Sequence, residues 1–464
     1  MVHVFSHYVS PRLALLIVLE ALVLTLAAYA GVSFHLAGVE ASTAVSGAMA
    51  LPKATAFALC MLMVVNSMGL YEPTLWRSRG AIVVRVAAAI VLGLGITFLV
   101  MYLVPSLRLR PEGLAIMAIA ALTGGSLVRF AFFRWGDLGA FKQRVLVLGT
   151  GSRVMKLAEF AQHNHNHVVV GYVAFQPSTH YVPLPQVLSM APGDSLMSVV
   201  EKYGIDQIVI AVRDRRGGAL PVQELLECRL KGVKVVELPT YFEREYQQVM
   251  LESLNPSWIL LGDGFRQGLF RTTVKRLFDL VVSGALLLLT FPVMLAAAVC
   301  IFLESGLPVL YRQERVGQGG RVFTVYKLRS MKNTAESDGT PRWAVANDDR
   351  TTRVGQIIRK LRIDELPQII NVFKGEMSFV GPRPERPFFV DTLAKQIPYY
   401  ALRHSVKPGI TGWAQVRYPY GASLDDAVAK LQYDLYYVKN HTLFLDLVVL
   451  IDTVQVVLWG KGAR

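Results

Sequence analysis

The chain has 464 residues, of which 53% are hydrophobic and only 18% are charged, and its mean hydropathy is +0.40. This composition excludes an entirely soluble protein, so we expect segments embedded in a membrane. The formal net charge of +14 favours an anionic membrane surface and phosphate-bearing substrates. We do not expect nucleic acid as a partner, because the sequence has no zinc-finger spacing and no repeat of aromatic and basic residues.

The amino-terminal part contains four apolar runs of the length that membrane-spanning helices need. Residues 1–140 are therefore predicted to form a four-helix transmembrane domain. Ala28-Tyr29-Ala30 resembles a cleavage site, but we expect the first segment to be retained. The basic residues of the short loops place both ends of this domain in the cytoplasm. The four runs cover approximately 13–32, 54–70, 82–104 and 114–133.

Residues 141–255 are predicted to form a Rossmann-like parallel α/β domain. An apolar strand runs into Gly149-Thr150-Gly151, as at the start of a dinucleotide-type βαβ unit. Later apolar runs alternate with helical stretches, which favours a parallel sheet. Val154 stands where the motif has its third glycine, and Phe175-Gln176 ends the second strand without an acid. We therefore expect the fold without a nicotinamide cofactor.

A linker is predicted at 256–272 and a catalytic α+β domain at 273–464. This domain opens with an apolar run, 280–303, that is long enough to cross a bilayer. Crossing would place the carboxyl-terminal residues outside the cytoplasmic membrane, and basic residues flank both ends of the run. We therefore expect the chain to return to the face that it entered.

Pro292 offers a way to make this return. A proline removes one helical hydrogen bond, so we predict a re-entrant helix that breaks at Pro292. Thr290 is a candidate donor to the carbonyl group near Leu288 that the proline frees. A kinked helix that spans the membrane is the alternative.

Two adjacent carboxylates, Asp364 and Glu365, lie among cations in the last quarter of the chain. Helical spacing predicts one helix over 354–362. Pro367 is tolerated only in a first turn, so a second helix should begin near Asp364 and stop at Gly375. The two carboxylates then lie at a helix N-terminus, where backbone N–H groups favour anions.

The chemistry that this arrangement suggests is phosphoryl transfer. One carboxylate would attack phosphorus, and the other would help to hold a divalent cation. Arg359 and Arg383 would grip the phosphates, Arg383 from the rigid turn Gly381-Pro382-Arg383-Pro384 that follows a short strand. An aspartate that caps a helix, followed by a surface glutamate, explains the spacing equally well.

A family resemblance decides between these interpretations. The run from Arg359 to Pro384, RKLRIDELPQIINVFKGEMSFVGPRP, closely resembles the signature of the bacterial sugar transferase family, the large monotopic phosphoglycosyl transferases. This family transfers a hexose-1-phosphate from a UDP-hexose to undecaprenyl phosphate and releases UMP. The resemblance covers Lys275 to the C-terminus, including Tyr311 to Gly317, Phe323 to Met331 and Lys407 to Val416, and the first half in architecture only.

The resemblance also assigns roles to residues. Asp364 matches the nucleophile that forms a phosphosugar-aspartate intermediate, and Glu365 matches its partner at the Mg²⁺ site, so both are expected metal ligands. Arg359 and Arg383 match anion contacts. Further residues expected to bind substrate phosphate are Lys275, Arg276 and Lys407. Asp348 and Asp349 could approach the metal, although a solvated loop explains them as well.

The expected protein is an enzyme of the bacterial inner membrane whose catalytic domain faces the cytoplasm. It would initiate an exopolysaccharide, capsule or O-antigen repeat by a ping-pong mechanism, and the added domains are compatible with a homodimer. The sequence leaves the hexose open. Two rival functions also stay open: a catalytically silent, nucleotide-sensing scaffold of polysaccharide assembly, and a nicotinamide-dependent sugar-nucleotide enzyme.

The last apolar run, 443–459, follows three tyrosines, Tyr433, Tyr436 and Tyr437. This pattern suits a membrane-surface helix with aromatic anchors, and it suits a core helix equally well. Asp446 and Asp452 argue against a spanning helix.

Overall fold

The computed structural model describes residues 2–4, 7–9, 11–37, 50–71, 79–107, 111–135, 142–161, 167–174, 181, 187–188, 195–212, 220–254, 268–332, 350–419, 421 and 423–459. The chain divides into two compact units. One comprises Met1–Val2 and Ala131–Gly262, and the other comprises His3–Phe130 and Asp263–Arg464. The predicted boundaries near 140, 255 and 272 are finer than this division and stay predictions.

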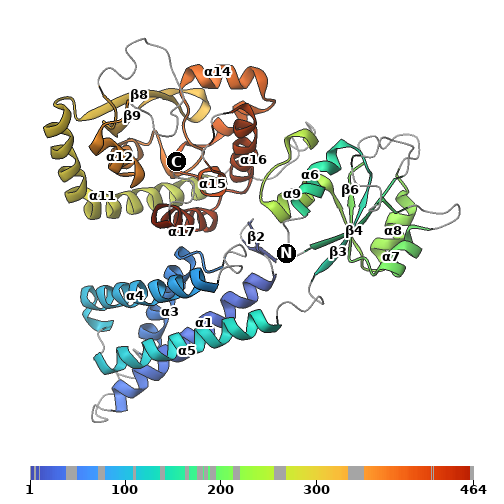
Figure 1. Ribbon diagram of the computed structural model, residues 1–464, viewed down its shortest axis with the longest axis horizontal. Coiled ribbons are helices and arrows are strands. Elements are labelled where there is room, and N and C mark those ends of the chain that lie inside the picture. Colours follow the sequence, from blue (N-terminus) through green and yellow to red (C-terminus); the bar gives the residue numbers. More distant parts are fainter. Residues whose placement is uncertain are drawn as a thin grey trace. The chain divides into compact units, whose positions relative to one another are not determined.

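The amino-terminal part is helical where it was predicted to be (Figure 1). Three of its helices and α11 of the carboxyl-terminal part are long and apolar enough to cross a membrane, whereas α3 is a shorter apolar helix. The described elements are β1 (Val2–Val4), β2 (His7–Val9), α1 (Pro11–Ala37), α3 (Ala50–Ser67), α4 (Arg79–Leu103), η2 (Pro105–Leu107) and α5 (Pro111–Trp135).

Small and apolar side chains pack these helices together. Ala28 and Ala54 are completely buried against Phe57 and Met117. Small residues let helix backbones approach closely, which is how helices associate where water supplies no driving force. The outward faces keep large apolar groups exposed, such as Leu99 and Phe130, as expected for contact with lipid.

One polar cluster interrupts this apolar packing. Glu20 of α1 is only 2% exposed. Arg129 of α5 donates to both of its carboxylate oxygens, through Nε and, at 3.1 Å, through Nη2. The Tyr71 hydroxyl donates to the same carboxylate at 2.5 Å. This cluster joins α1 and α5 to the turn that follows α3, and its contacts hold these segments together.

The second section forms a parallel sheet with the order β5-β4-β3-β6-β7. Numbered along the chain this is 3-2-1-4-5, the order of doubly wound sheets. The described elements are β3 (Gln143–Leu148), α6 (Ser152–Ala161), β4 (His167–Val173), β5 (Val187–Leu188), α7 (Leu196–Tyr203), β6 (Gln207–Ile210), α8 (Val222–Leu230), β7 (Lys234–Glu237), α9 (Leu238–Tyr246) and η5 (Leu251–Ser253).

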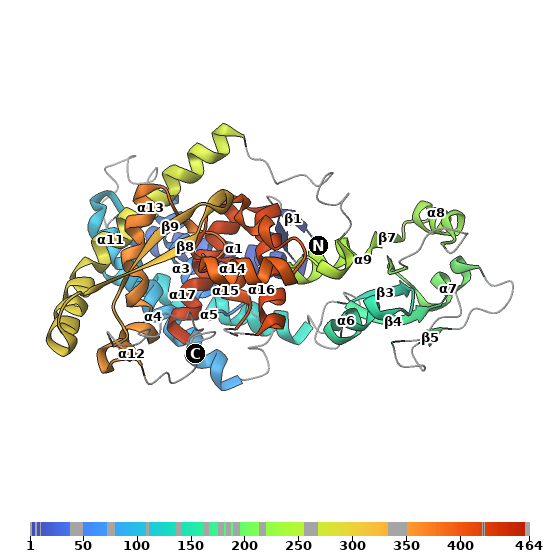
Figure 2. The ribbon, with the colours of Figure 1, turned by 90° about the horizontal axis from the view of Figure 1, so that it is seen from above.

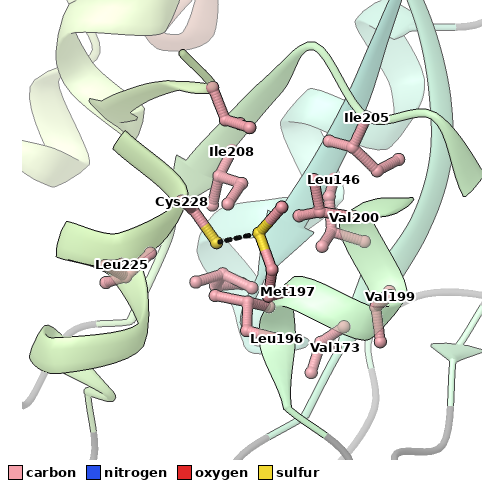
Figure 3. Close-up of a cluster of buried hydrophobic side chains, with 12 residues drawn as sticks. Leu146, Val173, Leu196, Met197, Val199, Val200, Ile205, Ile208, Leu225 and Cys228 are labelled. Carbon is pink, nitrogen blue, oxygen red and sulfur yellow. Dashed lines mark hydrogen bonds between the residues drawn. The ribbon is translucent and has the colours of Figure 1, made fainter. Parts of the chain in front are cut away.

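Alternation along β3 assigns its side chains to two cores. Val145 and Val147 face α6 and α9, whereas Leu146 and Leu148 face α7 and α8. All four are completely buried, because helices cover both faces of the sheet. Figure 3 shows the second core, in which the Cys228 thiol lies 3.9 Å from the Met197 sulfur. The predicted parallel α/β section is confirmed at this level; Phe175-Gln176 lies outside the described residues.

The carboxyl-terminal part mixes helices with short strands. Its described elements are α11 (Leu269–Ser305), β8 (Leu310–Val316), η6 (Gln318–Gly320), β9 (Val322–Leu328), α12 (Arg353–Lys360), η7 (Ile363–Gln368), α13 (Ile369–Lys374), β10 (Ser378–Val380), α14 (Pro387–Gln396), η8 (Tyr400–Ser405), β11 (Gly409–Thr411), α15 (Trp413–Arg417), α16 (Leu424–Asn440) and α17 (Leu443–Trp459). The β8–β9 hairpin is antiparallel and β10 pairs with β11 in parallel. Figure 2 shows the hairpin beside α13, where Val325 packs on Val372.

The first helix of this part corrects the predicted break. The α11 helix runs through Pro292 without interruption, and Figure 1 shows that its ribbon bends. The prediction for Thr290 is wrong: its hydroxyl donates to the carbonyl of Leu286 at 2.7 Å, four residues earlier. A threonine hydroxyl on a helix reaches the carbonyl one turn back, so it satisfies that group instead of one freed near Leu288.

The last two helices belong to the core of this fold. Tyr436 and Tyr437 are 0% and 2% exposed, so these tyrosines do not anchor the helix in a membrane surface. The Tyr437 hydroxyl donates to Asp446 at 2.7 Å and to the Val380 carbonyl at 3.0 Å. The predicted aromatic anchors are therefore wrong for Tyr436 and Tyr437, and α17 contributes Leu445 and Val449 to the core, where both are completely buried.

Candidate active site

A tight reversal of the chain presents the two carboxylates. The α12 helix ends at Leu361, and Arg362 adopts the left-handed conformation with φ 59°. The next turn, η7, is a 3₁₀ helix and continues directly into α13, which ends at Gly375 with φ 83°. The predicted start and stop are confirmed, but the first turn is tighter than an α-helix. Pro367 has no N–H to donate, which weakens the α-helical hydrogen-bond ladder there.

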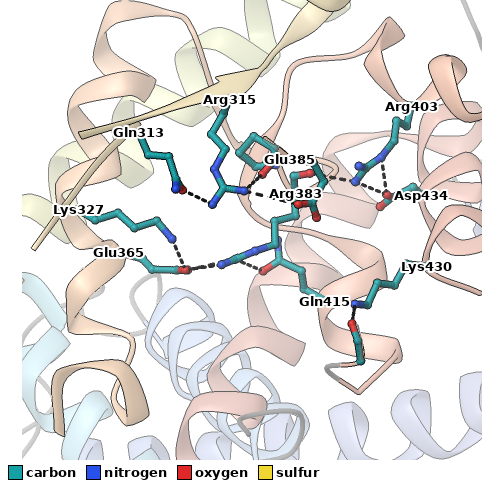
Figure 4. A network of polar contacts seen from close by, with 12 residues as sticks. Gln313, Arg315, Lys327, Glu365, Arg383, Glu385, Arg403, Gln415, Lys430 and Asp434 are labelled. Atoms are coloured by element: carbon teal, nitrogen blue, oxygen red, sulfur yellow. Dashed lines mark hydrogen bonds and ion pairs between the residues drawn. The ribbon is translucent and has the colours of Figure 1, made fainter. Parts of the chain in front are cut away.

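Glu365 is surrounded by cations. It is 7% exposed and accepts from Arg383, through Nη2 at 2.6 Å and Nη1 at 3.3 Å. Lys327 of β9 donates to the same carboxylate at 3.0 Å, and Arg362 lies 3.9 Å away. Figure 4 shows Lys327 and Arg383 reaching Glu365 from different elements. A fork-shaped guanidinium and a lysine thus hold both oxygens of one carboxylate.

Asp364 has a different environment. It is 8% exposed, and its Oδ1 atom is buried without a hydrogen-bond partner among the described residues. A buried polar atom in this condition is rare in a stable fold and costs free energy. The two adjacent carboxylates are therefore not equivalent: one is saturated, and the other has an oxygen available for another group.

The pKa values follow this difference. Burial raises the pKa of Asp364 to about 6, and the negative charge of Glu365 adds to the effect. Burial also acts to raise the pKa of Glu365, but Arg383 and Lys327 outweigh it and hold that pKa well below its usual range. Lys327, Arg362 and Arg383 partly offset the rise at Asp364. Asp364 is thus the more basic carboxylate of the pair.

The segment that carries Arg383 is packed tightly. The amide of Gly381 donates to Thr411 at 2.9 Å. A Cβ atom on Gly381 would lie 2.3 Å from the Lys407 carbonyl oxygen, so only glycine fits there. Arg383 reaches out of this segment to Gln415 at 3.2 Å as well as to Glu365. The predicted strand and turn before Arg383 are confirmed by β10 and these contacts.

Three of the expected phosphate-binding residues lie elsewhere. Lys275 lies between two carboxylates, 2.8 Å from Asp279 and 2.9 Å from Asp446. Arg276 donates to the carbonyl of Phe373 at 2.8 Å, at the C-terminus of α13 and thus at the opposite end of this helix from Asp364. Lys407 joins Arg276 there: a Cβ on Gly375 would lie 3.6 Å from Arg276 Nη2 and 3.7 Å from Lys407 Nζ.

Arg359 also has its own contact. Its Nη1 donates to the Thr351 hydroxyl at 3.1 Å, within the segment that begins α12. Of the cations named from the sequence, the structure therefore brings Arg383 to the pair Asp364 and Glu365, which we call the dyad. It places Lys275, Arg276 and Arg359 in other contacts.

Sequence reasoning gave no role to Lys327 and Gln415. Lys327 lies in a segment of β9 that resembles the family, and its side chain is only 17% exposed. A buried lysine is rare and would indicate a functional contact, but its burial cannot be predicted from the strand pattern around Val325 and Leu328.

A divalent cation fits this site as far as the described residues go. They contain no group of three or more His, Cys, Asp or Glu side chains arranged around one point. Mg²⁺ commonly uses one or two carboxylates and completes its shell with substrate phosphates and water. The free Oδ1 of Asp364 meets this requirement, whereas Glu365 is already occupied by cations. Asp348 and Asp349 lie outside the described residues.

Comparison with known proteins supplies the family. Residues 270–460 match the model of the family described as bacterial sugar transferase. A UDP-N-acetylgalactosamine-undecaprenyl-phosphate N-acetylgalactosaminephosphotransferase of Aeromonas hydrophila is 42% identical over 259 residues, 56% of this chain and 60% of that protein. A UDP-glucose:undecaprenyl-phosphate glucose-1-phosphate transferase of Xanthomonas campestris pv. campestris is 34% identical over 334 residues, 70% of this chain and 68% of that protein.

A UDP-glucose:undecaprenyl-phosphate glucose-1-phosphate transferase of Escherichia coli (strain K12) is 38% identical over 223 residues, 47% of this chain and 48% of that protein. The shared region thus spans from about half to about two thirds of these relatives. Each of these three relatives is named as a transferase. Because the family model covers the dyad and the second relative is matched over most of both chains, this chain belongs to the bacterial sugar transferase family and is a transferase.

Proposed function

We propose that the protein transfers a hexose-1-phosphate from a UDP-hexose to undecaprenyl phosphate and releases UMP. The observation that carries this proposal is the inequality of the dyad: Glu365 is saturated by Arg383 and Lys327, while Asp364 keeps a buried oxygen free. The relatives named above act on a UDP-sugar and undecaprenyl phosphate by name, which supports the same substrate classes here.

Asp364 is the nucleophile of this proposal. Its carboxylate oxygen attacks the phosphorus that bears the hexose, and the bond from that phosphorus to the bridging oxygen breaks. The bridging oxygen and its electron pair leave with UMP. An oxygen of undecaprenyl phosphate then attacks the same phosphorus, and the aspartate is released. The raised pKa of Asp364 supports this role, because a more basic carboxylate is the stronger nucleophile.

Glu365 and the cations prepare this step. Arg383 and Lys327 keep Glu365 ionised, and they place positive charge beside the pair, where phosphate charge would gather. Asp364, with Glu365 beside it, would hold Mg²⁺, whose charge would neutralise that of the phosphate oxygens. Arg359, Arg276 and Lys407 stay proposals as contacts for other phosphate groups, and Lys275 is a weaker one because two carboxylates already engage it.

The proposed position of the enzyme rests on α11. Near one end of this helix, Asp279 accepts from the Ser378 hydroxyl at 3.1 Å. Near the other end, Ile301 packs on Leu328. The middle is apolar and open, with the Leu288 side chain 81% exposed. Both ends thus contact one fold, which supports a helix that dips into the bilayer and returns to the same face.

We further propose that this face is the cytoplasmic face of the bacterial inner membrane, where nucleotide sugars are made. The enzyme would there initiate an exopolysaccharide, capsule or O-antigen repeat. The parallel sheet of the second section has the strand order of Rossmann-like domains, which supports that description of the section. A homodimer remains part of the proposal, with the membrane helices and this added section as its expected interface.

The test is an assay of UMP release. The full chain in detergent or nanodiscs would be incubated with Mg²⁺, undecaprenyl phosphate and a panel of UDP-sugars that includes UDP-glucose, UDP-galactose and UDP-N-acetylgalactosamine. We expect UMP and a lipid-linked phosphosugar with at least one donor. A chain that binds donors but releases no UMP with any of them would contradict the proposal and favour the silent scaffold.

A further inference from the structure

The segment that carries Arg383 cannot fix its own backbone. Pro382 and Pro384 have no N–H group, so the Gly-Pro-Arg-Pro-Glu run offers carbonyl acceptors with few amide donors. Each of four successive carbonyls accepts from a different partner. The contacts are Gly409 N to Pro382 at 3.0 Å, Arg403 Nη2 to Arg383 at 2.9 Å, Arg315 Nη1 to Pro384 at 3.0 Å and Val316 N to Glu385 at 2.9 Å.

Arg403 is the donor to the residue that grips the dyad. It is 6% exposed and comes from η8, outside the segment. Its Nε and Nη2 donate to Asp434 of α16 at 3.1 and 2.7 Å, and its Nη1 donates to the Tyr400 hydroxyl at 2.9 Å. Nη2 therefore donates both to the Asp434 carboxylate and to the Arg383 carbonyl. In Figure 4, Arg403 and Asp434 lie on one side of Arg383, and Glu365 lies on the other.

A buried ion pair by itself is weak evidence for a role in activity, because many such pairs only fix the fold. Glu20 and Arg129 are an example in this chain. Their side chains are 3% and 10% exposed, close to the 3% and 6% of Asp434 and Arg403. The difference is the third partner: Arg403 also holds the backbone of Arg383, whose guanidinium holds Glu365.

We propose that Arg403, held by Asp434, is a positioning residue that fixes the Arg383 guanidinium on Glu365. This inference rests on the proposed function, because it assigns the pair a role in that reaction. Arg403 touches neither substrate nor the reacting atoms and acts only through Arg383. A lysine at 403 keeps the charge beside Asp434, but its single ammonium cannot reproduce the planar set of contacts.

The test is a double-mutant cycle on the full chain in nanodiscs. Arg403→Lys and Asp434→Asn should each lower kcat by about 10-fold, and by no more than Arg383→Lys itself, because they only displace the Arg383 guanidinium. The KM for undecaprenyl phosphate should change little. In a protein that already carries Arg383→Lys, the further substitution Arg403→Lys should hardly change kcat, because the guanidinium that Arg403 positions is absent. Glu20→Gln is the matched control: it should lower the unfolding temperature and leave kcat of the folded protein unchanged.

Hydrogen exchange reports on the same claim without an assay. The amides of Gly381, Arg383, Glu385 and Arg386 should exchange faster in Arg403→Lys and Asp434→Asn than in the unmodified chain, and Glu20→Gln should not change them. If the double variant lost kcat by the product of the two single losses, Arg403 would act independently of Arg383, and the positioning role would be wrong. Unchanged exchange of these amides would also overturn it. If the unmodified chain releases no UMP, the proposed function fails, and faster exchange alone then leaves Arg403 as a structural residue, which also overturns the proposal.

Discussion

Two buried carboxylate clusters of this chain invite comparison. In the helical bundle, Glu20 accepts from Arg129 and Tyr71, and both of its oxygens are occupied. In the catalytic fold, Glu365 is occupied in the same way, but the neighbouring Asp364 keeps Oδ1 without a donor. The three carboxylates are each less than a tenth exposed, so their burial does not distinguish the two clusters. The difference is that Oδ1 of Asp364 has no hydrogen-bond donor among the described residues.

The difference has a physical basis. A carboxylate in an apolar surrounding must be neutralised and fully hydrogen-bonded, or it destabilises the fold. The bundle cluster satisfies this condition by itself and is therefore structural. The pair Asp364 and Glu365 leaves it unmet at Asp364, where a substrate or cation could supply the missing contact. Unmet hydrogen-bonding capacity therefore distinguishes Asp364 from Glu20.

The largest expected effect is the loss of the open carboxylate. Asp364→Asn should reduce UMP release by at least about 1,000-fold, because the amide is not a nucleophile. Release of UMP from a UDP-hexose measures it, with Asp391→Asn on the exposed face of α14 as the control. An Asp364→Asn enzyme with near-normal turnover would remove the nucleophile assignment.

The closed cluster should respond in stability instead of activity. Glu20→Gln leaves Arg129 buried without its counter-charge, which should cost about 3–5 kcal/mol of unfolding free energy. Denaturant unfolding in detergent micelles measures this cost. Glu112→Gln, at an exposed position of α5, should change it by less than about 0.5 kcal/mol. Equal stability of the two variants would contradict the structural role of the cluster.

A smaller effect should follow from changing the cation that saturates Glu365. Arg383→Lys keeps one charge and loses the paired N–H contacts to Glu365 and the contact to Gln415. Charge-assisted hydrogen bonds contribute about 1.5–3 kcal/mol, so kcat should fall by about 10- to 100-fold. Steady-state kinetics measures it, with Arg321→Lys at the exposed β8–β9 turn as the control. Wild-type kinetics would mean that the fork is dispensable.

The smallest expected effect concerns pH. Burial, helped by the charge of Arg403, lowers the pKa of His404 from 6.5 to about 4. Below pH 6.5 the unfolded chain therefore binds a proton that the folded chain rejects. Stability from this group is complete above pH 6.5 and declines as the pH falls toward 4, by at most about 1.4 kcal/mol per pH unit.

His404→Gln should remove this part of the acid sensitivity. Unfolding temperatures between pH 7 and 4.5 would be compared for the two proteins, and the wild type should lose more. An identical decline in both would show that His404 does not titrate in this range.

Much of the catalytic fold follows from local sequence. The helix before the dyad, the turn at Pro367 and the stop at Gly375 follow from neighbouring residues, because proline and glycine limit the backbone directly. The division of β3 between two cores also follows from simple alternation. The sequence did not predict which cations contact the carboxylates. Lys275 and Lys327 both lie in segments that resemble the family, but Lys275 pairs with Asp279 and Lys327 pairs with Glu365.

The sequence by itself determined the apolar helices, the order of the elements and the identity of the two carboxylates, because each depends on residues close together in the chain. The tertiary structure decided which carboxylate stays open and which arginines matter. Those facts depend on pairs such as Lys327 with Glu365 and Arg403 with Asp434, which are 38 and 31 residues apart. Packing brings such pairs together, and local pattern contains no information on their distance.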